Sequence, residues 1–281
     1  MSTSIKINRN GKVFYTIRSR YVFNEVMRDE STCLEFLRLV FPELHIQSIR
    51  TNSEQTMENH LGKRGIRLDI YIEEQGASRI IDLEMQVADY PSELPKRTRY
   101  YSSTIDGWLL KKNEDYEKLC DTIVLFICPF DPFGRGQKIY TFENICKEEP
   151  SLTLQDGQQV RFLNTVGVRG SISAELQAVF DYITSDDGET EDRFAKKLKE
   201  MVAEINADKE RMGVVMTFEQ EVNRINSVWK DKLDEKEALL EQNAALLEQN
   251  AISLEQKDSQ LHAQAQLIED LQKQIEALKK G

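Results

Sequence analysis

The sequence has few of the residues that build disulfide frameworks or structural zinc sites. It contains four cysteines and three histidines among 281 residues, and no two cysteines are spaced as C-x-x-C. A disulfide framework needs more cysteines in a short chain, and a structural zinc site needs Cys or His ligands at closer spacing. We therefore expect the four cysteines to be small apolar residues in a reducing compartment.

Long hydrophobic runs are also missing. A membrane-spanning helix needs ~20 apolar residues, whereas the longest run, TIVLFICPF at 122–130, has the length of a strand. The first residues, MSTSIKINRNGK, are polar and lack the apolar stretch of a secretory signal. We expect no membrane partner and a cytoplasmic location.

The negative net charge does not favour binding to nucleic acid at first sight, but the charge is unevenly distributed along the chain. The chain carries a formal net charge of −11. Residues 1–185 carry only −3, and the remaining 96 residues carry −8. The acidity of the C-terminal part is therefore weak evidence against phosphate contacts in the N-terminal part.

The composition changes near TSDDGET at 184–190. Strand-like and helix-like segments alternate before it, whereas Glu, Lys, Gln, Ala and Leu dominate after it. This change predicts a globular domain at 1–185, a helical extension at 186–230 and a heptad-repeat coiled coil at 231–281. The extension is expected to pack on the globular domain.

A heptad repeat supports the last of these segments. ALLEQNA occurs twice in succession, and one apolar column has a spacing of seven. Its members are Leu233, Leu240, Leu247, Leu254, Leu261, Ile268 and Ile275. Such a column is typical of a coiled coil. The second column is small and polar, so we expect a modest coiled coil that forms a homo-oligomer; a single charged helix is the alternative.

Periodicity in the N-terminal part predicts a mixed α/β domain with a central sheet covered by helices. The expected helices are 21–41 (one or two), 92–112 and 173–184, and the expected strands are 67–74, 79–87, 121–130, 138–146 and 159–167.

Two of these strands form a hairpin that brings carboxylates together. In IIDLEMQV, at 80–87, polar and apolar residues alternate, which predicts a half-buried strand. If the loop is 75–78, Asp69 lies opposite Glu84 and Arg67 opposite Gln86. Opposed side chains have Cβ atoms ~4.5–5.5 Å apart, so two like charges meet with no cation between them. Either the pair is an exposed surface feature, or it binds a divalent cation such as Mg²⁺ or Mn²⁺.

Several further motifs occur in order around this hairpin: LPKRTRYYSSTID, then LKKNEDYEKLCDTIVLFICPFDPFG, then IYTFENIC and FLNTVG. Together with RLDIYIEE and RIIDLEMQ, they resemble the PD-(D/E)XK nuclease family transposases, the recombination-promoting nuclease group, over roughly residues 15–185. The resemblance implies a restriction-endonuclease-like core and magnesium-dependent cleavage of DNA.

Residue by residue, the resemblance places Asp69 at the motif aspartate, Glu84 at the D/E position and Gln86 at the lysine position. It thus assigns catalysis to Asp69, Glu84 and Gln86, and the metal to Asp69 and Glu84. Leu68 stands where the motif has proline, and Gln86 lacks the charge of lysine, although it could orient the attacking water.

The resemblance also implies neighbours for this site. A further acid often comes from the first helix, where Glu25 and Glu35 are the candidates. Apart from the resemblance, Arg67 and the basic cluster Lys96, Arg97 and Arg99 at the start of the helix at 92–112 are candidate contacts to the DNA backbone; a solvated helix face is the alternative for the cluster.

Two other functions stay open. The core could be an inactive, nuclease-like interaction domain assembled by the coiled coil, which the uncharged Gln86 and the overall negative charge favour. The carboxylate pair could also serve a glycosidase. Divalent-cation binding that is lost in Asp69→Ala would distinguish an active nuclease from an interaction domain.

Overall fold

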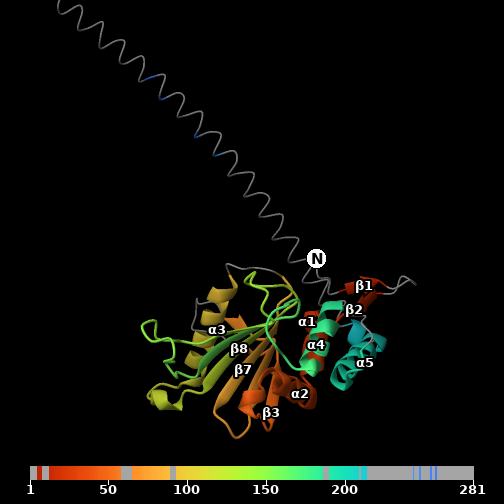
Figure 1. Ribbon diagram of the computed structural model, residues 1–281, viewed down its shortest axis with the longest axis horizontal. Helices are drawn as coiled ribbons and strands as arrows, with labels where there is room; N and C mark the ends of the chain where they lie inside the picture. The colour runs from red at the N-terminus through yellow and green to blue at the C-terminus, as the bar shows by residue number, and fades with distance from the viewer. Residues whose placement is uncertain are drawn as a thin grey trace, which may run out of the picture. The chain divides into compact units, whose positions relative to one another are not determined.

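Figure 1 shows the structure, a computed structural model, which describes residues 5–7, 13–57, 65–88, 93–185, 190–208, 210–213 and the single residues 243, 247, 254 and 257. The chain divides into two units, 1–216 and 217–281. Most of the predicted heptad segment lies outside the described residues, so the coiled coil stays a prediction.

The described strands lie in the first unit. They are β1 (Ile5–Ile7), β2 (Val13–Tyr15), β3 (Ile49–Ser53), β4 (Thr56–Met57), β5 (Ile66–Arg67), β6 (Ile70–Glu74), β7 (Arg79–Met85), β8 (Asp121–Cys128), β9 (Ile139–Phe142) and β10 (Gln158–Asn164). The α-helices are α1 (Arg20–Met27), α2 (Glu30–Val40), α3 (Leu94–Leu109), α4 (Ala174–Ser185) and α5 (Arg193–Ala207).

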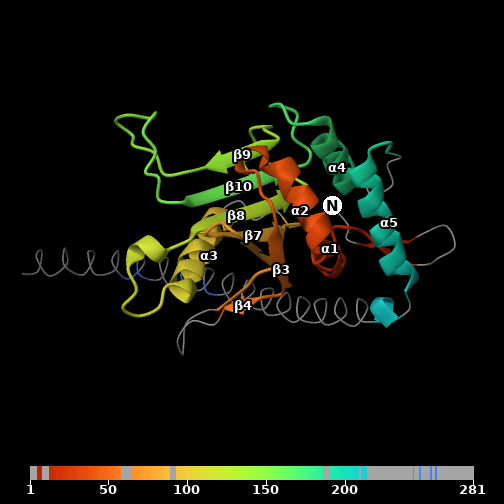
Figure 2. The same ribbon diagram turned by 90° about the horizontal axis from the view of Figure 1, so that it is seen from below.

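Six strands form one mixed sheet in the order β3-β6-β7-β8-β10-β9, which can be followed in Figure 2. The three strands β7, β8 and β10 are parallel, and the other pairings are antiparallel. Strand β8 has the sequence DTIVLFIC and is buried on both faces, as expected for a central strand of a parallel sheet.

Helices cover both faces of this sheet. On one face, residues such as Ile81 and Leu125 pack against α1, α2, α4 and α5. On the other face, Tyr71 and Ile80 pack with Ile105 of α3, and Phe126 packs with Leu94 at its start. Figure 1 shows α3 standing apart from the other helices, across the sheet. Residues 80, 82, 84 and 86 of the hairpin therefore face α3, because side chains alternate along a strand.

The predicted α/β architecture with a mixed central sheet is confirmed. One detail is wrong: the polar face of the strand at 79–87 is buried rather than exposed, because α3 covers it. A second detail also differs. The predicted strand at 67–74 is split into β5 and β6, and strands β1–β4 lie where no strand is predicted.

Helix α5 is tied to the N-terminal part of the chain by one buried side chain. Asn206 Oδ1 accepts a hydrogen bond from Tyr15 N at 2.8 Å, and its Nδ2 donates to Tyr15 O at 2.9 Å and Val202 O at 2.8 Å. These contacts join α5 to β2.

We expect Asn206→Ala to lower the free energy of unfolding by about 1–3 kcal/mol, because buried backbone groups lose their side-chain partner. Urea unfolding measures this. Glu204→Ala, an exposed position on the same helix, is the matched control and should change the midpoint little. Equal effects of the two variants would contradict the role of Asn206.

Candidate active site

The hairpin of β6 and β7 has the predicted register. Ile70 pairs with Leu83 and Tyr71 with Asp82, which places Asp69 beside Glu84. Strand β6 begins only at residue 70. The backbone N–H of Asp69, just before it, donates to a side-chain oxygen, Glu84 Oε1, at 2.9 Å. In return, Met85 N donates to Asp69 Oδ2 at 3.2 Å. The two carboxylates thus converge, as the sequence predicts.

Two arginines occupy the other side of this pair. Arg20 Nε, at the start of α1, lies 2.6 Å from Asp69 Oδ1, and Arg97 Nη2, from α3, lies 2.6 Å from Glu84 Oε2. The expectation that no cation lies near the pair is therefore wrong, because two helix N-termini bring guanidinium groups to it. Each of the four carboxylate oxygens has a described partner.

Gln86 lies next to the carboxylates on the same face of the sheet. Its Oε1 accepts from Arg97 Nη1 at 2.8 Å, and its Nε2 donates to Ala88 O at 2.5 Å. Arg97 in turn donates from Nε to Tyr101 Oη at 3.0 Å, and its guanidinium lies 5.2 Å from the centre of the Phe126 ring.

Asp82 is a third acidic residue on this face. It is fully buried, and neither of its oxygens has a hydrogen-bond partner among the described residues. Sequence reasoning assigned it no role, although the alternation with Glu84 and Gln86 places it on the same side of β7. Arg20 is missed as well, and no local pattern points to it.

Burial dominates the ionisation of this cluster. Burial and the charge of Asp69 raise the pKa of Glu84 to about 8. Burial also raises the pKa of Asp69, an effect that the Arg20 guanidinium opposes. Burial and the neighbouring Glu84 charge raise the pKa of Asp82 well above its usual range. Each of these buried carboxyls therefore binds its proton more tightly than an exposed carboxyl does.

A pocket of about 600 Å³ opens in front of the two arginines. Its lining includes the four basic residues Arg20, Arg67, Lys96 and Arg97, with Tyr100, Tyr101 and Glu93. Three of the four predicted backbone contacts are therefore at this pocket. Arg99 is exposed on α3 and is not among the lining residues, and Arg67 also pairs with Glu54. The pocket is basic, as a phosphate-binding surface requires.

The candidate acids of the first helices point elsewhere among the described residues. Glu25 lies 3.6 Å from Arg28, and Glu35 pairs with Arg193 and Lys197 of α5. The residue that these helices bring to the carboxylates is the cation Arg20.

The sequence model of one protein family, the PD-(D/E)XK nuclease family transposases, matches residues 20–242. The chain belongs to this family. No curated protein matches the chain. The family is nuclease-like, its superfamily consists in general of nuclease hydrolases that use divalent metals, and it implies a DNA substrate. Among the described residues, no helix is long and apolar enough to cross a membrane.

The donor set formed by Asp69 and Glu84 fits a hard divalent cation. Within the described part of the chain, no three His, Cys, Asp or Glu side chains form a metal-binding group. Asp69 and Glu84 nevertheless offer two adjacent carboxylates, and carboxylates accept several contacts each. Mg²⁺ commonly takes one or two carboxylates and completes its shell with water and phosphate oxygens. The set suits such an ion and does not suit zinc, which prefers nitrogen and sulfur ligands.

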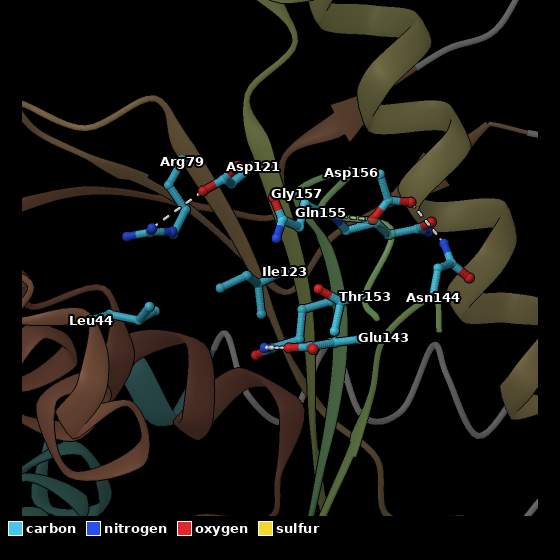
Figure 3. A pocket seen from close by; sticks show the side chains of 12 residues that line it. Leu44, Arg79, Asp121, Ile123, Glu143, Asn144, Thr153, Gln155, Asp156 and Gly157 are labelled. Atoms are coloured by element: carbon cyan, nitrogen blue, oxygen red, sulfur yellow. Dashed lines mark hydrogen bonds and ion pairs between the residues drawn. The ribbon is translucent and has the colours of Figure 1, made fainter. Parts of the chain in front are cut away.

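A second pocket, of about 200 Å³, lies at the opposite ends of the parallel strands (Figure 3). Its charged side chains are paired with each other or with neighbouring groups. Arg79 contacts Glu74 and Asp121, and Asn144 donates to Asp156 at 2.7 Å. This pocket has one arginine among several acids, so the basic pocket near Asp69 is the better candidate for the nuclease site.

Proposed function

We propose that the chain is a metal-dependent DNA endonuclease of the recombination-promoting type. The observation that carries this proposal is the convergence of Asp69 and Glu84, from neighbouring strands, beside a pocket lined by four basic residues. Asp69 and Glu84 would hold Mg²⁺ or Mn²⁺.

Basic residues of the chain bind the substrate and orient the metal ligands. Arg67, Lys96 and Arg97 bind the DNA backbone at the pocket, and Arg99 extends this contact along α3. A divalent ion held by Asp69 and Glu84 would supply Lewis-acid chemistry: it would polarise a phosphoryl oxygen and lower the pKa of a bound water. Arg20 holds the Asp69 carboxylate in place and lines the pocket, so it orients one metal ligand next to the substrate.

Cleavage of supercoiled plasmid DNA tests this function. Purified protein is expected to nick or cut the plasmid with Mg²⁺ or Mn²⁺, and EDTA should abolish the reaction. Cleavage that is equally fast in EDTA, or no cleavage with either ion, would refute the proposal.

One alternative function is supported by a specific observation. Asp69 Oδ1 pairs with Arg20, and Glu84 Oε2 pairs with Arg97. These two arginines neutralise the two carboxylates without a metal ion. A nuclease-like interaction domain could use the site in this form. Calorimetric titration with Mn²⁺ separates the two functions: an active site binds the ion and loses it in Asp69→Ala, whereas an interaction domain binds none.

We also propose that the chain self-associates through 231–281. Two members of the apolar heptad column, Leu247 and Leu254, are helical and 70% and 65% exposed. Exposed leucines at this spacing favour a partner helix.

Deleting 231–281 is expected to lower the oligomeric state measured by sedimentation. The double variant Leu247→Lys/Leu254→Lys should act in the same direction, because two charges enter the apolar column. The matched control is Asn243→Lys, which lies outside that column. An unchanged particle mass after the deletion would remove the coiled-coil proposal.

A further inference from the structure

We infer that Arg97 supplies the positive charge of the active site, and that Gln86 is a positioning residue that holds Arg97 against Glu84. This inference rests on the proposed nuclease function and assigns that site its charged group.

The guanidinium of Arg97 is held at three points. Its Nη2 contacts Glu84 Oε2 at 2.6 Å, its Nη1 donates to Gln86 Oε1 at 2.8 Å, and its Nε donates to Tyr101 Oη at 3.0 Å. Aromatic rings add to this support: the guanidinium carbon lies 5.0 Å from the centre of the Tyr101 ring and 5.2 Å from that of Phe126. The side chain is thus fixed by two strands and its own helix.

The fork of Arg97 still has capacity for a ligand. A guanidinium carries five N–H donors, and each of these three contacts uses one. With respect to the described residues, two N–H groups remain, one on each terminal nitrogen. The side chain is 27% exposed and lines the basic pocket, so these donors lie where a phosphate would enter.

Gln86 is engaged at both ends of its amide. The oxygen accepts from Arg97, and the nitrogen donates to Ala88 O at 2.5 Å. An amide has no net charge, so Gln86 cannot itself stabilise the negative charge that develops on a phosphoryl group. With the oxygen taken by Arg97, Gln86 acts on the reaction through that arginine rather than through a water.

The other cations of the pocket do not combine these contacts. Arg20 pairs with Asp69, and Lys96 is exposed at the start of α3, whereas Arg97 bonds to both Glu84 and Gln86. A guanidinium is not deprotonated in proteins, so Arg97 keeps its charge in this position.

A double-mutant cycle tests this pairing. The variants Arg97→Ala, Gln86→Ala and the double variant are compared in cleavage rate with Mg²⁺. We expect a loss in kcat of about 10²–10³-fold for Arg97→Ala, a smaller loss for Gln86→Ala, and no further loss in the double variant. Independent, additive losses would overturn the inference.

A charge-rescue arm separates the role of the cation from a role in folding. Gln86→Lys is introduced into Arg97→Ala, which returns a positive charge to the same place. Recovery of at least tenfold in kcat is expected, and no recovery would overturn the inference. Arg97→Lys, which keeps charge but not the fork, serves as the second variant and should lose less kcat than Arg97→Ala. Lys112→Ala is the matched control, because Lys112 is an exposed cation beyond the end of α3 and is not among the residues that line the pocket; it should leave kcat unchanged.

Binding of a short DNA duplex without metal keeps the result independent of catalysis. Arg97→Ala and Gln86→Ala are expected to weaken binding, with the double variant no weaker than Arg97→Ala. If the wild type cleaves nothing with either ion, the proposed function fails, and this binding cycle alone decides the pairing. Additive binding losses would refute it in that case too.

Discussion

Exchanging Glu84 for Gln, or Asp69 for Asn, should reduce DNA cleavage on the order of 10³-fold or more. Each substitution keeps the size of the side chain and removes the negative charge that a divalent ion requires. In the Glu84→Gln variant an amide nitrogen must face either the Arg97 fork or the backbone N–H of Asp69, both of which are donors. The variant therefore loses the metal and gains a mismatched contact.

Folding of these variants is checked by thermal unfolding before rates are compared. The matched control is Glu93→Gln, because Glu93 is an exposed carboxylate that lines the same pocket. It should leave kcat unchanged. Cleavage at the wild-type rate by Asp69→Asn/Glu84→Gln would refute the assignment of both residues.

The register of the hairpin could be predicted because residues within the hairpin itself determine it. Alternation along 79–87 sets which residues share a face, and the four-residue loop at 75–78 sets the register. Gly76 has a φ of 86° and supplies the left-handed conformation of that turn. Asp69, Glu84 and Gln86 are brought together by these features alone, so the sequence predicts their proximity correctly.

The environment of the hairpin could not be predicted in the same way. Alternation marks the face that carries Asp82 and Glu84 as polar, and a polar face is usually exposed. Its burial depends on α3, whose position is set by packing of Leu94 and Ile105 rather than by the hairpin. Arg20 comes from a helix far from Asp69 in sequence, and Arg97, 13 residues from Glu84, reaches it only because α3 packs across the sheet, so no spacing rule links the arginines to the carboxylates.

The stability of the metal-free protein should fall as pH rises from about 4.5 to about 8. Glu84 has an ordinary pKa of 4.5, and burial together with the Asp69 charge raises it to about 8 in the folded chain. The pKa of Asp82 is raised in the same direction by burial and by the charge of Glu84. The folded state therefore binds more protons than the unfolded state within this range. The contribution of these protons to stability is complete below pH 4.5 and is lost as pH rises through about 8.

Thermal unfolding in EDTA across this pH range measures the effect. Each extra proton that the folded state binds lowers the free energy of unfolding by ~1.4 kcal/mol per unit rise in pH. Glu84→Gln and Asp82→Asn cannot titrate at these positions, so each should flatten the profile, and Glu93→Gln should not. A flat wild-type profile, or one unchanged in Asp82→Asn/Glu84→Gln, would contradict the prediction.

Added Mg²⁺ should reverse much of this loss at the alkaline end. Metal binding requires deprotonated carboxylates and releases their protons, so its affinity rises with pH in the range where the cluster is losing stability. Binding to the folded chain alone then stabilises it by mass action. The protonated cluster and the metal-bound cluster are thus alternative ways of removing the repulsion between the same buried acids. A midpoint that falls equally with and without Mg²⁺ would show that these carboxyls do not bind the ion.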